Sequence, residues 1–189
     1  MGMIGNFPAV GIVSSANLAD RAVTAPKLDT TASQLFGFRN RIINGDMRID
    51  QRNAGASVTV TSGDGYIYAV DRFINFNNTG VNYVAQQVAD APAGLSYSTK
   101  LTFASSISLT TTGEATFSQV IEGFNVADLG WGTADAQTIT IGFWVKSSFT
   151  GTFSVGVANL GGTRCYAASY IINSTNTWEY KTVNVVGDT

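Results

Sequence analysis

The side chains that could carry chemistry are few, because the chain contains no histidine and a single cysteine, Cys165. Ser-His-Asp and Cys-His triads cannot form without an imidazole, and neither can the usual His and Cys sites for zinc. Carboxylates, lysines and hydroxyls remain. Cys165 lies in an apolar segment, so we expect a buried, reduced thiol there, with no disulfide partner in the chain.

Four carboxylates are dense enough in sequence to consider for glycosidase chemistry: Glu114, Glu122, Asp128 and Asp135. A glycosidase needs two carboxyl groups roughly 5 to 9.5 Å apart in a cleft. Glu114 and Glu122 lie at opposite ends of one expected strand, about 26 Å apart, and the other two lie in a loop. The chain also lacks a dense Asp-x-Asp run of the kind that binds calcium. We therefore expect no enzyme, no metal site and no cofactor.

Aromatic side chains offer a better candidate for a binding site. An exposed Trp or Tyr packs on the apolar face of a sugar ring, while Asn, Asp or Gln side chains bind its hydroxyls. The candidates for such a glycan platform are Trp144, Trp131, Tyr166 and Tyr170. Trp144 points to the polar side of its strand, and the two tyrosines share one face of another. The alternative for each is packing under a loop or against a neighbouring subunit.

Two arginines near the start of the expected domain could bind an anionic ligand. Arg48 and Arg52 lie in a segment that also contains carboxylates. The alternative is that they pair with Asp46, Asp50 or Asp71 and fix the first strand to the fold.

The elements that position these residues are predicted to be β-strands, and the segment 137–157 has the clearest pattern. Ile141 and Phe143 alternate with polar residues, and the alternation resumes with Phe153 and Val155 after a short turn-forming stretch. The pattern predicts an antiparallel hairpin, whose apolar face must be covered by a second sheet.

Further strands are predicted in the rest of the chain, at the regular intervals that are typical of a β-sandwich. Residues 39–52 are expected to form a strand, a turn at 44–46 and a second extended piece. One long crossing, 122–137, should hold a helical turn capped by Asn125, and such crossings are typical of jelly-roll wiring. We thus expect an all-β, antiparallel jelly-roll β-sandwich. Its further strands are expected near 57–61, 66–76, 81–88, 96–104, 114–122, 138–147, 152–158, 164–172 and 178–186.

Low charge is the main departure from average composition. Only 13% of residues are charged, against about 25% in a typical domain. The net charge of −2 favours neither nucleic acid nor an anionic membrane as a partner. No apolar run reaches the roughly 18 residues of a membrane span.

Residues 1–39 are expected to form an extended arm for attachment or oligomerisation, and 40–189 the sandwich. A weak ten-residue repeat pairs Val13 with Val23 and Leu18 with Leu28. These apolar residues are too sparse for a core within one chain, so we expect the arm to lie against another subunit or protein. The alternative is a flexible leader without a partner.

Several motifs in combination resemble modules of bacteriophage tail-fibre and related virion appendage proteins. The leader LADRAVTAPKL (18–28) is similar to the linking repeats that precede such modules. The other motifs are RIINGDMRIDQR (41–52), YAVDRF (68–73), FSQVIEG (117–123), DLGWGTA (128–134), FWVKSS (143–148) and TGTF (150–153).

The resemblance implies a jelly-roll domain like a carbohydrate-binding module, carried on a homotrimeric fibre or attached to the virion near its tail or head. It also implies contact with other virion proteins through the arm. Because the family pattern continues beyond Gly187, the implied sandwich is truncated at its C-terminal end.

The expected function is that of a non-enzymatic structural component of a phage particle, located in the virion. The arm attaches the protein, and the sandwich faces outward for adhesion to the host surface. The alternative is a carbohydrate-binding module that recognises host glycan, which predicts an exposed aromatic cluster around Trp144 or Trp131. A second alternative, a glycan-degrading enzyme, requires paired carboxylates in a cleft, one with a raised pKa.

Overall fold

The structure, a computed structural model, describes residues 40–107 and 113–189, and residues Arg41–Thr189 form one compact unit. The expected arm, with Val13, Leu18, Val23 and Leu28, lies outside the described residues. Its role in attachment and oligomerisation stays a prediction.

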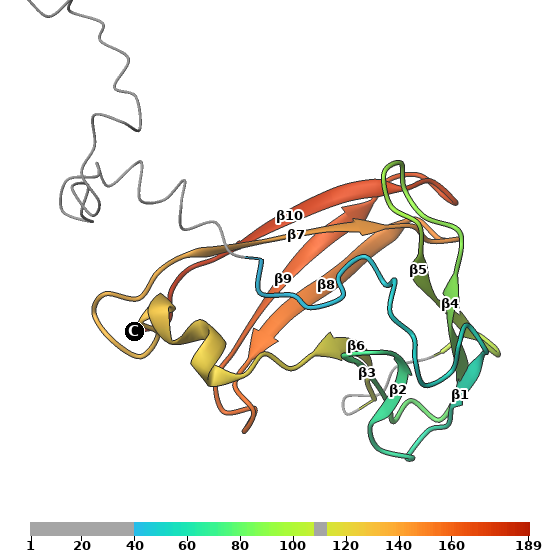
Figure 1. The fold of residues 1–189 in the computed structure, drawn as a ribbon, viewed down its shortest axis with the longest axis horizontal. Coiled ribbons are helices and arrows are strands. Elements are labelled where there is room, and N and C mark those ends of the chain that lie inside the picture. Colours follow the sequence, from blue (N-terminus) through green and yellow to red (C-terminus); the bar gives the residue numbers. More distant parts are fainter. Residues whose placement is uncertain (1–39, 108–112) are drawn as a thin grey trace, which may run out of the picture. The chain divides into compact units, whose positions relative to one another are not determined.

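The described residues form short strands and one 3-10 helix (Figure 1), and all the strand pairings are antiparallel. The all-β, antiparallel fold expected from the sequence is confirmed. The strands are β1 (Val58–Val60), β2 (Ile67–Val70), β3 (Phe73–Asn77), β4 (Tyr83–Val88), β5 (Ser98–Phe103), β6 (Ala115–Gln119), β7 (Ile139–Val145), β8 (Gly151–Ala158), β9 (Cys165–Ile172) and β10 (Glu179–Val185), and the helix is η3 (Gly123–Leu129).

The first six strands form two three-stranded sheets, with the orders β1-β4-β5 and β2-β3-β6. Their main buried cluster joins Val60 of β1, Ala69 of β2 and both Tyr83 and Ala85 of β4. Because alternate residues of a strand face opposite sides, Tyr83 and Ala85 point to the same interior. Burial raises the pKa of the Tyr83 hydroxyl to about 12. This cluster is the core of the N-terminal half of the sandwich.

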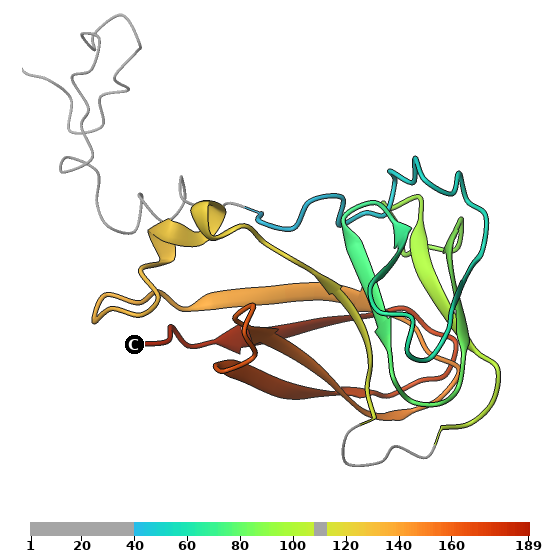
Figure 2. The ribbon, with the colours of Figure 1, turned by 90° about the horizontal axis from the view of Figure 1, so that it is seen from below.

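The last four strands form two two-stranded sheets, β7 with β10 and β8 with β9, on the other side of the unit from β1 to β5 (Figures 1 and 2). Aromatic contacts join the two pairs. The ring of Tyr170 on β9 meets Phe143 on β7 edge-on at 5.0 Å between centroids, and stacks on Phe153 of β8 at 6.0 Å. The apolar faces of the two pairs therefore pack on each other.

The hairpin predicted over 137–157 is wrong, although both of its strands exist. β7 pairs with β10 and β8 pairs with β9, so the loop 146–150 crosses between sheets. Alternation shows which residues of a strand point inward, but it does not identify the strand's partner. Two strands alternate in the same way whether they are hydrogen-bonded neighbours in one sheet or lie in two sheets packed face to face. The neighbours β1 and β4, β3 and β6, and β7 and β10 are far apart in sequence, as jelly-roll wiring requires.

Most expected strand ranges agree with the structure, with two corrections. The range 66–76 is two strands, because a hairpin turn at Asp71 and Arg72 separates β2 from β3. Residues 41–50 form no strand around their turn, since side chains rather than a strand partner satisfy their backbone.

Two expectations about single residues are also wrong. Asn125 lies inside η3, whose N-cap is Glu122, and the Asn125 amide donates to the Glu122 carboxylate at 3.2 Å. Cys165 is exposed rather than buried. Tyr166, Ala168, Tyr170 and Ile172 share the inward face of β9, which places Cys165 on the outer one.

Among the described residues, no helix has the length and apolar character to cross a bilayer.

Candidate functional site

A pair of exposed aromatic rings lies on the outer face of the β7–β10 sheet. Trp144 of β7 is directly opposite Tyr180 of β10 in the antiparallel register. Their ring centroids are 5.2 Å apart, with the planes tilted by 58°. Trp144 is 44% exposed and Tyr180 is 54% exposed. Directly opposite aromatic residues stabilise a strand pair, yet here they also present a large apolar surface to solvent.

Gly142 lets the Tyr180 ring lie along the sheet. It is two residues before Trp144 on the same face of β7, and it is opposite Thr182. A Cβ at residue 142 would overlap the Tyr180 hydroxyl and lie 3.0 Å from its Cζ. The missing side chain thus leaves the space that the tyrosine occupies. We call Trp144, Tyr180 and Gly142 the aromatic platform.

Neutral polar groups continue the same face beyond the platform. Thr140 is opposite Asn184, and its hydroxyl donates to the Asn184 side-chain oxygen at 2.8 Å. Both residues are exposed, as is Thr182 between them and Tyr180. The aromatic platform and these three residues form a continuous strip on one sheet face. The strip combines apolar ring surface with amide and hydroxyl groups, the combination that binds a sugar.

A polar cluster fixes the other end of the two strands. The Trp178 indole donates to an Asp90 carboxylate oxygen at 3.2 Å, and the other oxygen accepts from the Lys146 ammonium. Lys146 also lies over the Trp178 ring, 5.2 Å from its centroid. Hydrogen bonds from Lys146 and then Trp178 hold the pKa of the Asp90 carboxyl below its usual value. Trp178 therefore joins the loop after β4 to the start of β10.

Glu179, next to the platform, organises the crossing from β9 to β10. Its carboxylate accepts from the backbone N–H of Asn173 at 2.9 Å and of Ser174 at 2.8 Å, and it binds the Lys181 ammonium at 2.6 Å. The Lys181 hydrogen bond, followed by that from Ser174, lowers the pKa of Glu179 to about 2. These contacts of Glu179 hold the start of β10 in place, and with it the backbone of the next residue, Tyr180.

The four aromatic candidates from the sequence do not form one surface. Trp131 lies in the crossing after η3, where its indole donates to the Gln137 carbonyl at 2.7 Å. The Tyr166 hydroxyl donates to the Asn184 carbonyl at 3.2 Å. Tyr170 is packed between Phe143 and Phe153, and burial raises its pKa. Only Trp144 belongs to the platform.

Sequence reasoning missed Tyr180, the partner of Trp144. Its signal is the alternation in 178–186, which puts Tyr180 on the same face as Thr182 and Asn184. The register with β7 decides the pairing, and it joins residues that are far apart in sequence.

Arg48 and Arg52 were expected either to bind an anionic ligand or to pair with nearby carboxylates, and the structure fits neither role completely. Arg48 pairs loosely with Asp46 at 3.7 Å, whereas Arg52 lies over the ring of Tyr68, 4.8 Å from its centroid. Asp71 instead accepts from the Gln51 backbone N–H at 3.1 Å.

Carboxylates and amides, rather than the arginines, attach residues 44–55 to the sheet. Asp50 accepts from the backbone N–H of Asn53 and of Gly55, at 3.2 and 2.8 Å. The Asn53 amide donates to the carbonyls of Tyr68 and Ala69 on β2, at 3.3 and 3.0 Å. Asn44 does the same for the Asp71 carbonyl at 3.0 Å.

Two of the carboxylates considered for catalysis are engaged in ion pairs. Glu122 binds Arg72 at 2.7 Å and Asp128 binds Arg41 at 2.7 Å. The Arg72 hydrogen bond holds the pKa of Glu122 below its usual value, opposite to the raised pKa of a general acid. No group of three or more Asp, Glu, Cys or His side chains in the described ranges could hold a metal ion.

No protein-family model, curated protein or solved structure matches the chain.

Proposed function

We propose that this chain is a non-enzymatic structural protein of a bacteriophage particle, a tail fibre or appendage, whose sandwich adheres to host-surface glycan through the aromatic platform. The observation that carries the adhesion is the exposed pair of Trp144 and Tyr180 on one sheet face. The virion setting rests on the resemblance of the motifs described above.

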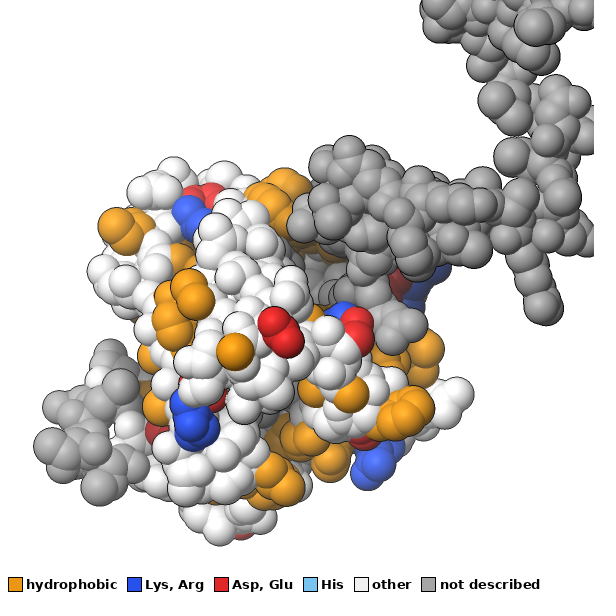
Figure 3. All heavy atoms as spheres, turned by 90° about the vertical axis from the view of Figure 1, so that its left-hand side faces the viewer, with side chains coloured by type: hydrophobic (Ala, Val, Ile, Leu, Met, Phe, Trp, Pro, Cys, Tyr) orange, Lys and Arg blue, Asp and Glu red, His pale blue; other side chains and the backbone are white. Residues whose placement is uncertain are grey.

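The chemistry of the platform favours a sugar over other ligands. The C–H face of a pyranose ring packs on Trp144 and Tyr180, and its hydroxyls meet the polar groups of Thr140 and Asn184. The nearest cation on that side, Lys146, is already paired with Asp90, so the strip carries little free charge. Figure 3 shows one face of the unit, on which hydrophobic patches and a few charged side chains lie among other side chains and backbone. A neutral portion of a glycan is the ligand that such a surface fits.

A printed array of bacterial surface oligosaccharides tests this function directly. We expect the full chain to bind a subset of them, and Trp144→Ala and Tyr180→Ala to lose that binding while keeping the native thermal transition. Phe124→Ala is the matched control, because Phe124 is 93% exposed on η3, away from the platform. Equal binding by the native chain and all three variants would refute the role of the platform in glycan binding.

The attachment role of the arm is tested separately. We propose that residues 1–39, through Val13, Leu18, Val23 and Leu28, join three copies and dock them on other virion proteins. Light scattering should give a trimer for the full chain and a monomer for residues 40–189. A full chain that is monomeric would exclude a trimer that assembles unaided.

A further inference from the structure

A second pair of aromatic rings lies on the β2–β3–β6 sheet. Tyr66, which precedes β2, contacts Phe76 of β3 with 5.6 Å between the ring centroids and the planes tilted by 50°. The Tyr66 side chain is 72% exposed, and Phe76 is partly exposed. The geometry resembles that of Trp144 and Tyr180 on the β7–β10 sheet, whose ring centroids are 5.2 Å apart with the planes tilted by 58°.

The strand register decides which residues share this face. The residues before and after Phe76 are fully buried, so Phe76 points to the outer side of the sheet. On β6, Thr116 is directly opposite Phe76 and Ser118 is opposite Ile74, and both hydroxyl residues are exposed. Neutral hydroxyl groups thus lie beside the ring pair, as they do beside the platform. We call Tyr66, Phe76, Thr116 and Ser118 the second aromatic surface.

The same two strands continue from the ring pair into a groove of about 900 Å³. Tyr68 of β2 is opposite Ile74 of β3, two residues along each strand from Tyr66 and Phe76, and both line the groove. The Arg52 guanidinium lies over the Tyr68 ring, 4.8 Å from its centroid. The second aromatic surface therefore has a concave end, as ligand sites commonly do.

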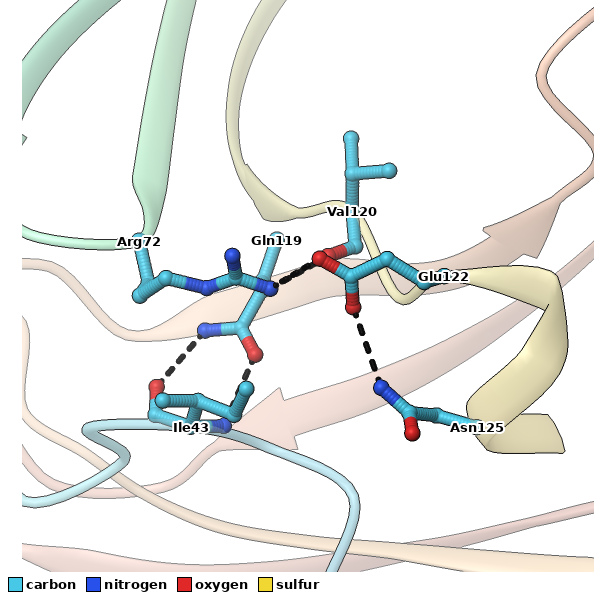
Figure 4. A network of polar contacts seen from close by, with 6 residues as sticks. All are labelled: Ile43, Arg72, Gln119, Val120, Glu122 and Asn125. Atoms are coloured by element: carbon cyan, nitrogen blue, oxygen red, sulfur yellow. Dashed lines mark hydrogen bonds and ion pairs between the residues drawn. The ribbon is translucent and has the colours of Figure 1, made fainter.

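Contacts within the protein fix the wall of this groove (Figure 4). The Arg72 Nη2 donates to the Glu122 carboxylate at 2.7 Å and to the Val120 carbonyl at 3.5 Å. The Gln119 side-chain amide accepts from the Ile43 backbone N–H and donates to its carbonyl, both at 2.8 Å. The groove therefore has its shape without a ligand.

The charges that line the groove balance. Arg72 is paired with Glu122, and the other two charged residues of the lining are Arg52 and Asp71. None of the four residues of the second aromatic surface is charged. A neutral sugar suits this combination, because its C–H face packs on the rings while its hydroxyls can donate to oxygen atoms and accept from N–H and O–H groups.

We propose that the second aromatic surface binds a neutral sugar residue of a glycan, with its ring on Tyr66 and Phe76 and its hydroxyls at Thr116 and Ser118. The next residue of the glycan extends over Tyr68 into the groove. The inference rests on the proposed glycan adhesion. It gives each chain a second contact with glycan, on a different sheet from the platform, and two linked contacts raise the avidity of adhesion.

A two-dimensional NMR titration of the backbone amides tests this surface, with maltotriose, cellotriose, galactotriose and chitotriose as neutral probes. We expect at least one probe to give saturable shifts at the amides of Phe76 and Thr116, both in the full chain and in Trp144→Ala. Tyr66→Ala should weaken the affinity measured at these two amides by at least about tenfold, whereas Tyr66→Phe, which keeps the ring, should retain it.

Phe149→Ala is the matched control. The Phe149 side chain is 73% exposed, close to the value for Tyr66, and it lies in the turn between β7 and β8. This variant should leave the affinity at Phe76 and Thr116 unchanged. Because both rings are largely exposed, Tyr66→Ala and Phe149→Ala should keep the native thermal transition.

The outcomes separate this surface from the platform. Shifts at Phe76 and Thr116 that survive in Trp144→Ala and are lost in Tyr66→Ala support it, even if the platform binds nothing. Shifts around Trp144 alone overturn the second aromatic surface and leave the platform intact. The absence of saturable shifts at Phe76 and Thr116 with all four probes, or an equal loss in Phe149→Ala, also overturns it.

Discussion

Tyr180 lies over Gly142 on the neighbouring strand, in the space that a Cβ would fill, with its Cζ 3.0 Å from that position. Because Trp144 follows Gly142 on the same face and is directly opposite Tyr180, the two rings share one surface. The position of the Tyr180 ring in the aromatic platform thus depends on a residue that has no side chain.

Gly142→Ala should therefore abolish glycan binding without removing an aromatic residue. The new methyl group displaces the Tyr180 ring, whose exposed side chain can rotate away, so the cost in folding free energy should be small. Glycan-array binding together with thermal unfolding measures both effects. Gly123→Ala is the matched control, because a Cβ at residue 123 would meet nothing within 4 Å, and this variant should bind normally. Undiminished binding by Gly142→Ala would show that the ring positions do not matter.

The Glu179 carboxylate should make stability depend on pH in the acid range. Its pKa is about 2 in the folded protein and about 4.5 when unperturbed. The unfolded chain therefore binds more protons between these values, so the contribution is fully present above pH 4.5 and is lost as the pH falls toward 2. Urea unfolding should show that Glu179→Gln is less stable than the native chain at pH 6, with a difference that shrinks toward pH 2. A difference independent of pH would contradict this role.

Asn77 should be a strong determinant of stability. Its side chain is fully buried, and its amide donates to the carbonyls of Val60 and Val81 at 3.1 and 2.9 Å. Asn77→Ala leaves both carbonyls without this donor, which should lower the free energy of unfolding by about 3 kcal/mol. Urea unfolding measures it, with the exposed Thr59→Ala as a control expected within about 0.5 kcal/mol of the native chain. A similar small change at both positions would be inconsistent with the buried network.

Asn53→Ala should loosen the segment before β1. Without the Asn53 amide, the carbonyls of Tyr68 and Ala69 lose a donor, and stability should fall by about 2 kcal/mol. Hydrogen exchange should be faster at the Gln51 and Gly55 amides, which bind Asp71 and Asp50. Unchanged protection at these two amides would mean that the carboxylates fix the segment alone.

The sequence predicts strands well where one face is buried. The alternation through Ile141, Phe143 and Val145 gives β7 nearly to the residue, because period-two burial needs no knowledge of the partner strand. It cannot say which strand is the partner, and the predicted β7–β8 hairpin is wrong for that reason.

The candidate site could be predicted only in part. The polar-face position of Trp144 is a local property, and the structure agrees with it. The contact with Tyr180 needs the β7–β10 register. Tyr170 packs against Phe143 and Phe153 rather than lying on an exposed surface, because an aromatic residue in an alternating strand fits either face. The sequence leaves Arg48 and Arg52 with two roles, binding an anionic ligand or pairing with nearby carboxylates. In the structure the Asp50 carboxylate and the Asn53 amide instead bind the backbone.

Indole N–H signals in a two-dimensional NMR titration with the best-binding array oligosaccharide test the central claim most directly. The three tryptophans are distinguishable, because the Trp131 and Trp178 indoles donate to Gln137 and Asp90, while the Trp144 indole lies on the exposed platform. The account predicts a saturable shift of the Trp144 signal, assigned with Trp144→Phe, and nearly unchanged signals from the other two. A bound oligosaccharide that shifts Trp131 or Trp178 and leaves Trp144 unmoved would contradict it.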